Sequence, residues 1–345
     1  MEDFSKYLIH NTCSIKDALV ALNSINSQVL TLFVVNGQNQ MIGTLTDGDI
    51  RRKLITGGTL DDSVESAMQE NFQYLNQNID ISQIKILKEK GIVLLPCLNS
   101  EKRIIKIYNL KKKLSILPID AVIMAGGKGI RLRPLTENTP KPLLKVGEKT
   151  IIDYNIDRLI SYGVENISVT VNYLKEQIEE HFKEKRNTIQ IKCVREPQYL
   201  GTIGSIKFVE TFQNDTILIM NSDLFTNIDY EDFYLHFKQN NADMSVAAVP
   251  YSISVPYGIF DLEGRCIKGI KEKPTFNYYA NAGIYLIKKE LLSLIPHNTF
   301  FNATDFIELL ISQKKIVIRF PIVGYWIDIG SHEDYKKTKE LIKHF

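Results

Sequence analysis

Strand-like runs alternate with amphipathic helical segments over the last two thirds of this 345-residue chain. The runs are residues 121–125, 166–171, 189–194, 216–220 and 244–250. Between the first two runs, Ile152, Ile156 and Ile160 share one face of a helix that ends at Gly163. This α/β alternation predicts a mostly parallel sheet with helices on both faces, and ligands of such sheets bind beyond the carboxyl ends of the strands.

The first part of the chain contains an internal repeat. "LFVVNGQNQMIGTLTDGDIRRKL" begins at Leu32 and "LPCLNSEKRIIKIYNLKKKL" begins at Leu95, and they align at one constant offset. Each copy predicts a strand, a polar turn, a second strand and the start of a helix, and each follows a helical stretch, at 15–25 and 81–90. Pro118 interrupts regular structure at 113–119, so we expect two domains, 1–116 and 119–345.

The repeat resembles the tandem CBS (Bateman) module, a small α+β regulatory domain. Its specific element is "GTLTDGDI", and the resemblance implies that Thr46 and Asp49 hold the ribose of an adenosine-type ligand. The alternative is that the same residues cap the helix that follows them. The second copy has Lys106, Asn109 and Lys112 at the matching positions, so the resemblance supports one nucleoside site at most.

Composition excludes several classes of protein. The formal net charge is only +2, and no apolar stretch reaches 18 residues, so neither a nucleic-acid partner nor a membrane span is expected. The cysteines are scattered without a metal-binding spacing, which favours reduced thiols: Cys13, Cys97, Cys193 and Cys266. The N-terminus lacks the apolar core of a secretory signal, and we expect a cytoplasmic protein.

The stretch "AVIMAGGKGIRLRPLTENTPKPLL" follows the junction. Its three glycines allow backbone N–H groups to converge on an anion, and Arg131 adds a charged phosphate contact. Prolines on both sides of Lys141 fix the backbone that presents this cation. Glycines alone would fit a structural turn equally well, but the rigidly held lysine favours a phosphate-binding loop.

The region from 121 to the end resembles the sugar-1-phosphate nucleotidyltransferases. The likeness continues through "EPQYLGT", "NSDLF", "YGIF", "KEKP", "NAGIYLI" and "WIDIGS" in the order of that family. It implies a Rossmann-like, GT-A-like sheet and a site that binds a nucleoside triphosphate and a sugar 1-phosphate. One position departs from the family pattern, because Ile130 stands where a threonine is common, and a hydroxyl donor to phosphate is lost.

The resemblance assigns roles residue by residue. The implied catalytic residues are Arg131, Lys141, Asp223, Lys273 and Asp328. Asp223 and Asp328 are also the implied ligands of Mg²⁺, which binds one or two carboxylates together with phosphate oxygens. The implied nucleotide-binding residues are Ala125, Gly126, Gly127, Gly129, Ile130, Arg131, Lys141, Glu196, Leu200, Gly201 and Thr202. The implied sugar-phosphate-binding residues are Gly258, Glu272, Lys273, Asn281 and Gly283.

The implied reaction is attack of a sugar phosphate oxygen on the α-phosphorus of the triphosphate, with release of pyrophosphate. It needs no protein nucleophile, and the motifs contain no Ser-His-Asp constellation. "PKPLL", "LGT" and "NAGIY" look closest to guanylyltransferases, and the CBS pairing resembles bacterial enzymes that make amino-sugar precursors of surface nonulosonic acids. We expect GTP and an amino-sugar 1-phosphate such as glucosamine 1-phosphate.

Two alternatives remain at this point. UTP, dTTP or CTP with another hexose 1-phosphate would use the same motifs. A catalytically silent nucleotide sensor is an alternative of another class, although retention of five charged site residues counts against it. By analogy with the CBS module we also expect a homodimer or a higher homo-oligomer.

Overall fold

The computed structural model describes residues 4–344 apart from 26–28, 77–79 and 187–188. The chain divides into two compact units, Met1–Ile116 and Leu117–Phe345. Each unit has its own buried core. In the described residues, no helix is both long enough and apolar enough to cross a bilayer.

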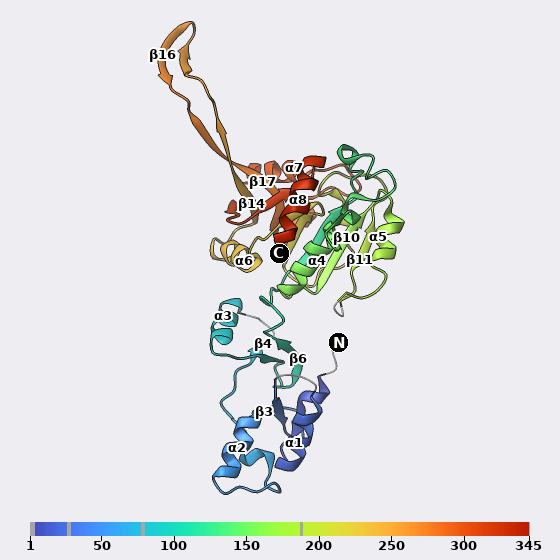
Figure 1. Cartoon of the computed structure of the whole chain (residues 1–345), viewed down its shortest axis with the longest axis vertical. Coiled ribbons are helices and arrows are strands. Elements are labelled where there is room, and N and C mark those ends of the chain that lie inside the picture. Colours follow the sequence, from blue (N-terminus) through green and yellow to red (C-terminus); the bar gives the residue numbers. More distant parts are fainter. Residues whose placement is uncertain (1–3, 26–28, 77–79, 187–188, 345) are drawn as a thin grey trace. The chain divides into compact units, whose positions relative to one another are not determined.

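The first unit contains the same small sheet twice (Figure 1). In each sheet the first strand pairs in parallel with the second, and the second pairs antiparallel with the third. The strands are β1 Leu8–His10, β2 Thr31–Val35 and β3 Met41–Thr46 in one sheet, and β4 Leu75–Asn76, β5 Leu94–Leu98 and β6 Ile104–Asn109 in the other. The helices are α1 Ile15–Ser24, α2 Asp47–Ile55 and α3 Ile81–Glu89.

The two copies differ after their last strand. In the first copy, Thr46 and Asp49 form a reciprocal capping box that starts α2. In the second copy, the expected helix is wrong, because the described residues 110–119 contain none. Asn109 accepts hydrogen bonds from Lys111 and Lys112 in a turn, and Lys112 offers no carboxylate at the position of Asp49.

The carboxylate of Asp49 is almost fully enclosed and has several donors. Thr46 donates its backbone N–H at 2.8 Å, Arg52 donates at 2.5 Å and Gln69 donates at 3.0 Å. Burial alone would raise the pKa of Asp49, but these hydrogen bonds outweigh it and hold the pKa below its ordinary value. Helix capping therefore accounts for this pair in the structure, and the nucleoside site at Thr46 and Asp49 stays a prediction.

The second unit is built on a seven-stranded, mostly parallel sheet, which confirms the expected mixed α/β architecture. Its order is β11-β10-β7-β12-β17-β14-β18, and only β17 runs antiparallel to its two neighbours. The strands are β7 Asp120–Ala125, β10 Asn166–Val171, β11 Lys192–Arg195, β12 Thr216–Asn221, β14 Met244–Ser254, β17 Thr275–Lys288 and β18 Val317–Pro321. Short ladders add β8 Lys145–Val146 with β9 Lys149–Thr150, β13 Leu224–Thr226 with β19 Trp326–Asp328, and β15 Ile259–Glu263 with β16 Cys266–Lys271.

Helices cover both faces of this sheet. Val122, Ile219 and Tyr285 point to one face, where they pack with α7 Ala303–Ser312 in a single core cluster. Met220 points to the other face and accepts a hydrogen bond from Tyr230 at the start of α6. The helices of this unit are α4 Ile151–Ser161, α5 Lys175–His181, α6 Tyr230–Gln239, α7 Ala303–Ser312 and α8 His332–Leu341.

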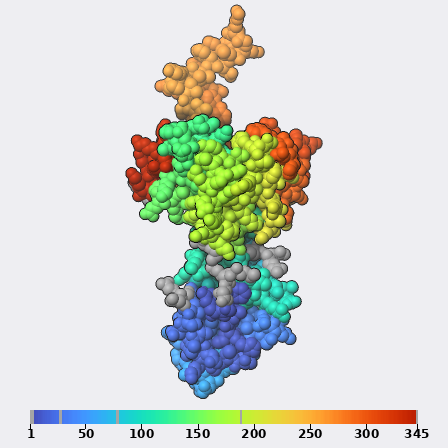
Figure 2. All heavy atoms as spheres, turned by 90° about the vertical axis from the view of Figure 1, so that its right-hand side faces the viewer, coloured from blue at the N-terminus to red at the C-terminus, as the bar shows by residue number. Residues whose placement is uncertain are grey.

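Two strands continue far beyond the sheet. The outer halves of β14 and β17 pair with each other from Val249 opposite Ala280 to Ser254 opposite Thr275, and β15 and β16 form the tip. We call residues 249–280 the arm. Figures 1 and 2 show it standing clear of the rest of the second unit. The sequence predicted the inner part of β14, at 244–250, but not this extension.

The capping box of α2 gives a test of the first unit. Replacing Thr46 with Ala removes an acceptor for the N–H of Asp49 and should cost the first unit about 1 kcal/mol of unfolding free energy. Hydrogen exchange of the α2 amides should accelerate accordingly. Thr46→Ser keeps the hydroxyl and is the matched control.

The single tryptophan, Trp326, belongs to the second unit, so its fluorescence follows that unit through a urea titration. This transition should be the same in the wild type and in both Thr46 variants. Equal exchange rates in the Ala and Ser variants would contradict the capping role.

Candidate active site

The carboxyl ends of four parallel strands meet at one edge of the sheet. β7 ends at Ala125 and lies between β10 and β12, and β11 flanks β10. The N–H of Ser222, just after β12, donates to the carbonyl of Met124 at 3.2 Å. Glu196 follows β11 and donates its own N–H to Val171 at 2.9 Å. The residues that follow these strands are thereby held side by side at the edge where ligands of such sheets bind.

The glycine loop leaves β7 with little room for side chains. Gly129 has φ +60°, and a Cβ there would lie 3.1 Å from the Cβ of Lys141. Its carbonyl accepts a hydrogen bond from the hydroxyl of Thr136 at 2.8 Å. Glycine at 129 is therefore required both by the left-handed backbone and by the close approach of Lys141.

Lys141 is nearly buried, and its ammonium group forms an ion pair with the carboxylate of Asp223. The same ammonium lies 4.0 Å from Oδ1 of Asp328. One ladder brings the carboxylates together, because β13 pairs with β19 and the N–H of Ile329 extends this pairing by donating to the carbonyl of Asp223 at 3.0 Å. Three predicted residues from distant parts of the sequence thus form one charged cluster.

The carboxyl group of Asp328 is partly buried among charged groups, which shift its pKa. Burial and, after it, the negative charge of Asp223 raise the pKa of Asp328, and the charges of Lys141 and Arg131 oppose that rise. The guanidinium of Arg131 lies over the backbone of Gly330, where a Cβ would approach it to 3.1 Å. Arg131 therefore belongs to the same cluster, although it is itself exposed.

The cluster suits a hard divalent cation that takes part of its coordination from a ligand. Oδ1 of Asp223 and Oδ1 of Asp328 are buried and accept no hydrogen bond. Such oxygens are expensive to leave unpaired, and carboxylate oxygens are the ligands that Mg²⁺ prefers. In the described residues, no group of three or more His, Cys, Asp or Glu side chains forms a complete cation site. Two carboxylates with phosphate oxygens would supply the remaining ligands.

Glu196 closes one side of the glycine loop. A Cβ on Gly126 would come within 2.4 Å of its carboxylate, so the loop backbone lies directly against this side chain. Burial raises the pKa of Glu196, while a hydrogen bond from the N–H of Leu200, at 3.4 Å, lowers it in part. The structure thus brings Glu196 beside the glycine loop.

The residues of the "LGT" segment pack against and hydrogen-bond to residues 301–303. Leu200 is fully buried, and its carbonyl accepts the N–H of Phe301 at 3.0 Å. Gly201 has φ +80° and approaches the carbonyl of Phe301 so closely that a Cβ would lie 2.6 Å from it. The hydroxyl of Thr202 accepts from the N–H of Ala303 at 2.8 Å, at the start of α7. Packing explains these residue types here, and their nucleotide role stays a prediction.

Asn281 and Gly283 lie at the foot of the arm. The ladder between β14 and β17 jumps between Val246 and Ala248, and Gly283, with φ +71°, occupies the resulting bulge. The side chain of Asn281 accepts the N–H of Gly283 at 2.9 Å, and a Cβ on Gly283 would meet Asn221 at 2.6 Å. The bulge therefore adjoins the carboxyl end of β12, near the charged cluster.

Three predicted residues are not brought to the cluster. These residues lie on the arm: Gly258 is partly exposed to solvent, and Glu272 and Lys273 are exposed. Gly258 and Glu272 adjoin each other, since a Cβ on Gly258 would lie 3.0 Å from Oε2 of Glu272. Lys273 has φ +44°, a strained value for a residue with a side chain.

Sequence reasoning missed residues that hold this edge together. Asn155 is buried on α4, and its amide donates to the carbonyl of Leu224 at 2.9 Å, next to Asp223. Trp326 donates its indole N–H to the carbonyl of Ala282 at 2.9 Å and so fixes the bulge of β17. An asparagine on the apolar face of a helix is a readable signal, whereas the partner of Trp326 depends on the fold.

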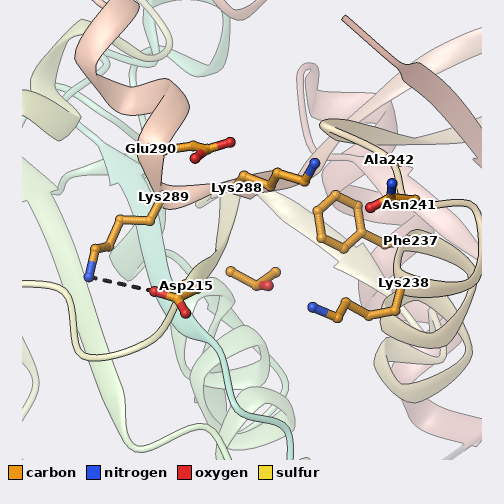
Figure 3. Close-up of a pocket in the computed structure, with 9 residues that line it drawn as sticks. Asp215, Phe237, Lys238, Asn241, Ala242, Lys288, Lys289 and Glu290 are labelled. Atoms are coloured by element: carbon orange, nitrogen blue, oxygen red, sulfur yellow. Dashed lines mark ion pairs between the residues drawn. The ribbon is translucent and has the colours of Figure 1, made fainter.

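A cavity of about 460 Å³ lies at the opposite edge of the sheet (Figure 3). Asp215 and Thr216 line it at the amino end of β12, and Lys288 and Lys289 line it after the inner part of β17. Its charges pair locally, with Lys288 2.8 Å from Asp243 and Lys289 3.9 Å from Asp215. This cavity is separate from the cluster of Lys141, which lies beyond the other end of β12.

Comparisons with known proteins agree with the geometry of the second unit. The family model described as "Nucleotidyl transferase" matches residues 120–344. A mannose-1-phosphate guanyltransferase of Yarrowia lipolytica is 31% identical over 62% of this chain and 61% of its own length. The bifunctional protein GlmU of Methanocaldococcus jannaschii is 33% identical over 65% of this chain and 54% of its own length.

Solved structures include the protein HddC of Yersinia pseudotuberculosis in complex with GMP-PN. It is similar with a TM-score of 0.50 and 26% identity, and the match covers 65% of this chain and 99% of that chain. This chain thus spans less than two thirds of the length of the curated relatives above, but nearly all of this solved one.

The contact between Gly126 and Glu196 can be tested with adjacent glycines. Gly126→Ala forces a Cβ against the buried carboxylate and should destabilise the second unit by about 1–3 kcal/mol. Gly127→Ala meets no atom within 4 Å and is the matched control, expected to unfold like the wild type. Trp326 fluorescence during urea unfolding measures both. Equal stability of the two variants would show that Glu196 does not pack against this loop.

Proposed function

Because this chain belongs to the nucleotidyl transferase family, we propose that it transfers a nucleoside monophosphate from a nucleoside triphosphate to a sugar 1-phosphate and releases pyrophosphate. The observation that carries the proposal is the cluster of Lys141, Asp223 and Asp328 beside the glycine loop, at the carboxyl edge of the sheet. A buried cation between two carboxylates, next to the backbone of a glycine loop, suits phosphate groups that arrive together with a divalent cation.

In the proposed reaction, an oxygen of the sugar phosphate forms a bond to the α-phosphorus. The bond from this phosphorus to the oxygen that bridges the α- and β-phosphates breaks, and pyrophosphate leaves with the electron pair. Lys141 and Arg131 neutralise phosphate charge, while the backbone around Gly126, Gly127 and Gly129 holds the triphosphate in line. Ala125, Ile130, Glu196 and the turn at 200–202 complete the nucleotide side.

Asp223 and Asp328 would hold Mg²⁺ through the carboxylate oxygens that lack hydrogen bonds. The cation would neutralise charge that builds up on the transferring phosphates. Lys141 keeps Asp223 oriented through their ion pair, and β13 and β19 fix the spacing of the two carboxylates. On the sugar side, we assign Asn281 and Gly283 at the foot of the arm, and Gly258, Glu272 and Lys273 on the arm.

We propose GTP and an amino-sugar 1-phosphate, such as glucosamine 1-phosphate, as the substrates. Similarity to mannose-1-phosphate guanyltransferases and to HddC, which was solved with GMP-PN, supports the guanine nucleotide. The amino sugar, and a role in bacterial surface glycan or nonulosonic acid precursors, rest on the sequence resemblance described above. The first unit would then be a CBS pair that regulates this reaction.

Pyrophosphate release tests the substrates. GTP, UTP, dTTP and CTP are each combined with glucosamine 1-phosphate, mannose 1-phosphate and glucose 1-phosphate in the presence of Mg²⁺. We expect the highest kcat/KM with GTP and glucosamine 1-phosphate, and no release after EDTA treatment until Mg²⁺ is restored. A higher value with UTP, dTTP or CTP would overturn the choice of base. No release with any pair would favour the nucleotide sensor.

Asp223→Asn tests the cluster. It removes a charge from the proposed cation site and should lower kcat by about 100-fold or more, with an unchanged circular dichroism spectrum. Asp215→Asn is the matched control, because Asp215 is exposed at the other end of β12 and should leave kcat unchanged. Near-normal turnover of Asp223→Asn in Mg²⁺ would remove Asp223 from the reaction.

A further inference from the structure

The inner part of the arm is a two-stranded ribbon continuous with the central sheet, and β15 and β16 form a separate ladder at its tip. Its ladder runs from the bulge at Gly283 outward to Ser254 opposite Thr275, and the N–H of Val255 continues it by donating to the carbonyl of Pro274 at 3.0 Å. Because the inner parts of β14 and β17 are locked between β18 and β12, the sheet sets the direction of the ribbon.

Each part of the arm has one apolar face. In the inner part, apolar residues pair across the ribbon, while the opposite face carries hydrogen bonds from Ser252 to Asn277, at 2.6 Å, and between Ser254 and Thr275, at 3.0 Å. The tip alternates in the same way, with Asp261 on its polar face. The apolar pairs are Tyr251 with Tyr278, Ile253 with Phe276, Phe260 with Ile270, and Leu262 with Ile267.

The described residues of the chain cover these apolar side chains only in part. Their exposed fractions run from 36% at Phe276 to 61% at Ile270. An isolated two-stranded ribbon is marginally stable in water, and exposed apolar patches on a soluble protein mark interaction sites.

The proposed site is divided between the core of the second unit and the arm. Lys141, Asp223 and Asp328 lie at the sheet edge, whereas Lys273 lies eight residues beyond Asn281 along the ribbon, roughly 25 Å at the rise of an extended strand. The left-handed backbone of Lys273 is strained, and strain of this kind gathers at functional sites. A site made from one chain alone therefore lacks the groups of the arm.

The rim of the core site offers a matching apolar surface. Ile130, next to Arg131 in the glycine loop, is 62% exposed. Tyr199 lies in the turn that follows Glu196, and its exposed ring packs against Phe300 with centroids 5.9 Å apart. Isoleucine at position 130 lacks a hydroxyl that could donate to phosphate, but it adds apolar surface beside the cluster.

We propose that the arm docks at the active site of a second copy of this chain, so that each complete site contains the cluster of one chain and Gly258, Glu272 and Lys273 of the other. The second copy is the occupant because its rim exposes Ile130, Tyr199 and Phe300 and its site lacks the groups that the arm carries. In a two-fold symmetric dimer, each chain docks its arm on the other chain. The same contact then occurs twice, so that both arms are covered and both sites are complete. The proposal rests on the proposed function for the roles of the arm residues, but not for the docking itself.

Mixing two inactive variants tests the exchange. Asp223→Asn damages the core and Lys273→Ala damages the arm. A mixed dimer then has one site with both defects and one site that is intact. With random pairing of equal amounts, half of the dimers are mixed, and we expect about a quarter of wild-type activity, far above either variant alone. The wild type serves as the active control. If the co-expressed variants are no more active than either variant alone, the arm does not complete the site of a second copy.

Hydrogen exchange tests docking without any need for activity. The amides at 249–280 should be protected at micromolar concentration and lose protection on dilution, because docking requires a second chain. Phe260→Asp should abolish this protection, and Asp261→Asn, on the opposite face of the same strand, is the matched control. Protection that is independent of concentration would mean that the arm folds onto its own chain. An arm that is unprotected at every concentration would point to a different partner, and either result overturns the proposal.

Discussion

The ion pair between Lys141 and Asp223 joins the two parts of the sequence on which the site depends. Lys141 comes from the loop after β7, and Asp223 comes from the turn after β12. A lysine so nearly buried needs a compensating charge, and the carboxylate needs the cation in return. Gly129 must be a glycine because Lys141 passes against it, and Asp328 is drawn to the same ammonium group through the pairing of β13 and β19. Losing Lys141 would leave two neighbouring carboxylates without their cation, whereas losing Asp223 would leave Asp328, 4.0 Å away, as the partner of the ammonium group.

The sequence predicted the sheet of the second unit well because β7 and β12 are buried on both faces and therefore appear as apolar runs. The strand β10 is equally buried, although Ser168 and Thr170 interrupt its apolar residues. The family resemblance also predicted Lys141, Asp223 and Asp328. Asp223 follows the end of β12, but Asp328 reaches the cluster through the antiparallel pairing of β13 with β19. The sequence did not predict the arm, because alternating apolar and polar residues at 251–280 are as typical of a half-buried strand as of an exposed ribbon. Periodicity shows that one face is apolar but not what covers it.

Some residues have strong local reasons for their identity, which a motif alone does not reveal. Thr46 and Asp49 form a complete capping box, Gly201 accommodates the carbonyl of Phe301, and Thr202 caps α7. A ligand role for such residues would be added to a structural role rather than replace it. The repeat in the first unit illustrates the same point, since both copies have the same sheet topology but only the copy with a capping carboxylate continues into a helix.

The bulge at Gly283 divides β17 into two segments with different chemistry. Residues from Ile284 inward are buried between two neighbouring strands, whereas those before Asn281 have a neighbour on one side only. Selection on the inner half acts through packing, and selection on the outer half acts through whatever the arm touches. The length of the arm and the side chains on it can therefore change while the sheet stays the same. What the arm binds can then evolve separately from the stability of the fold.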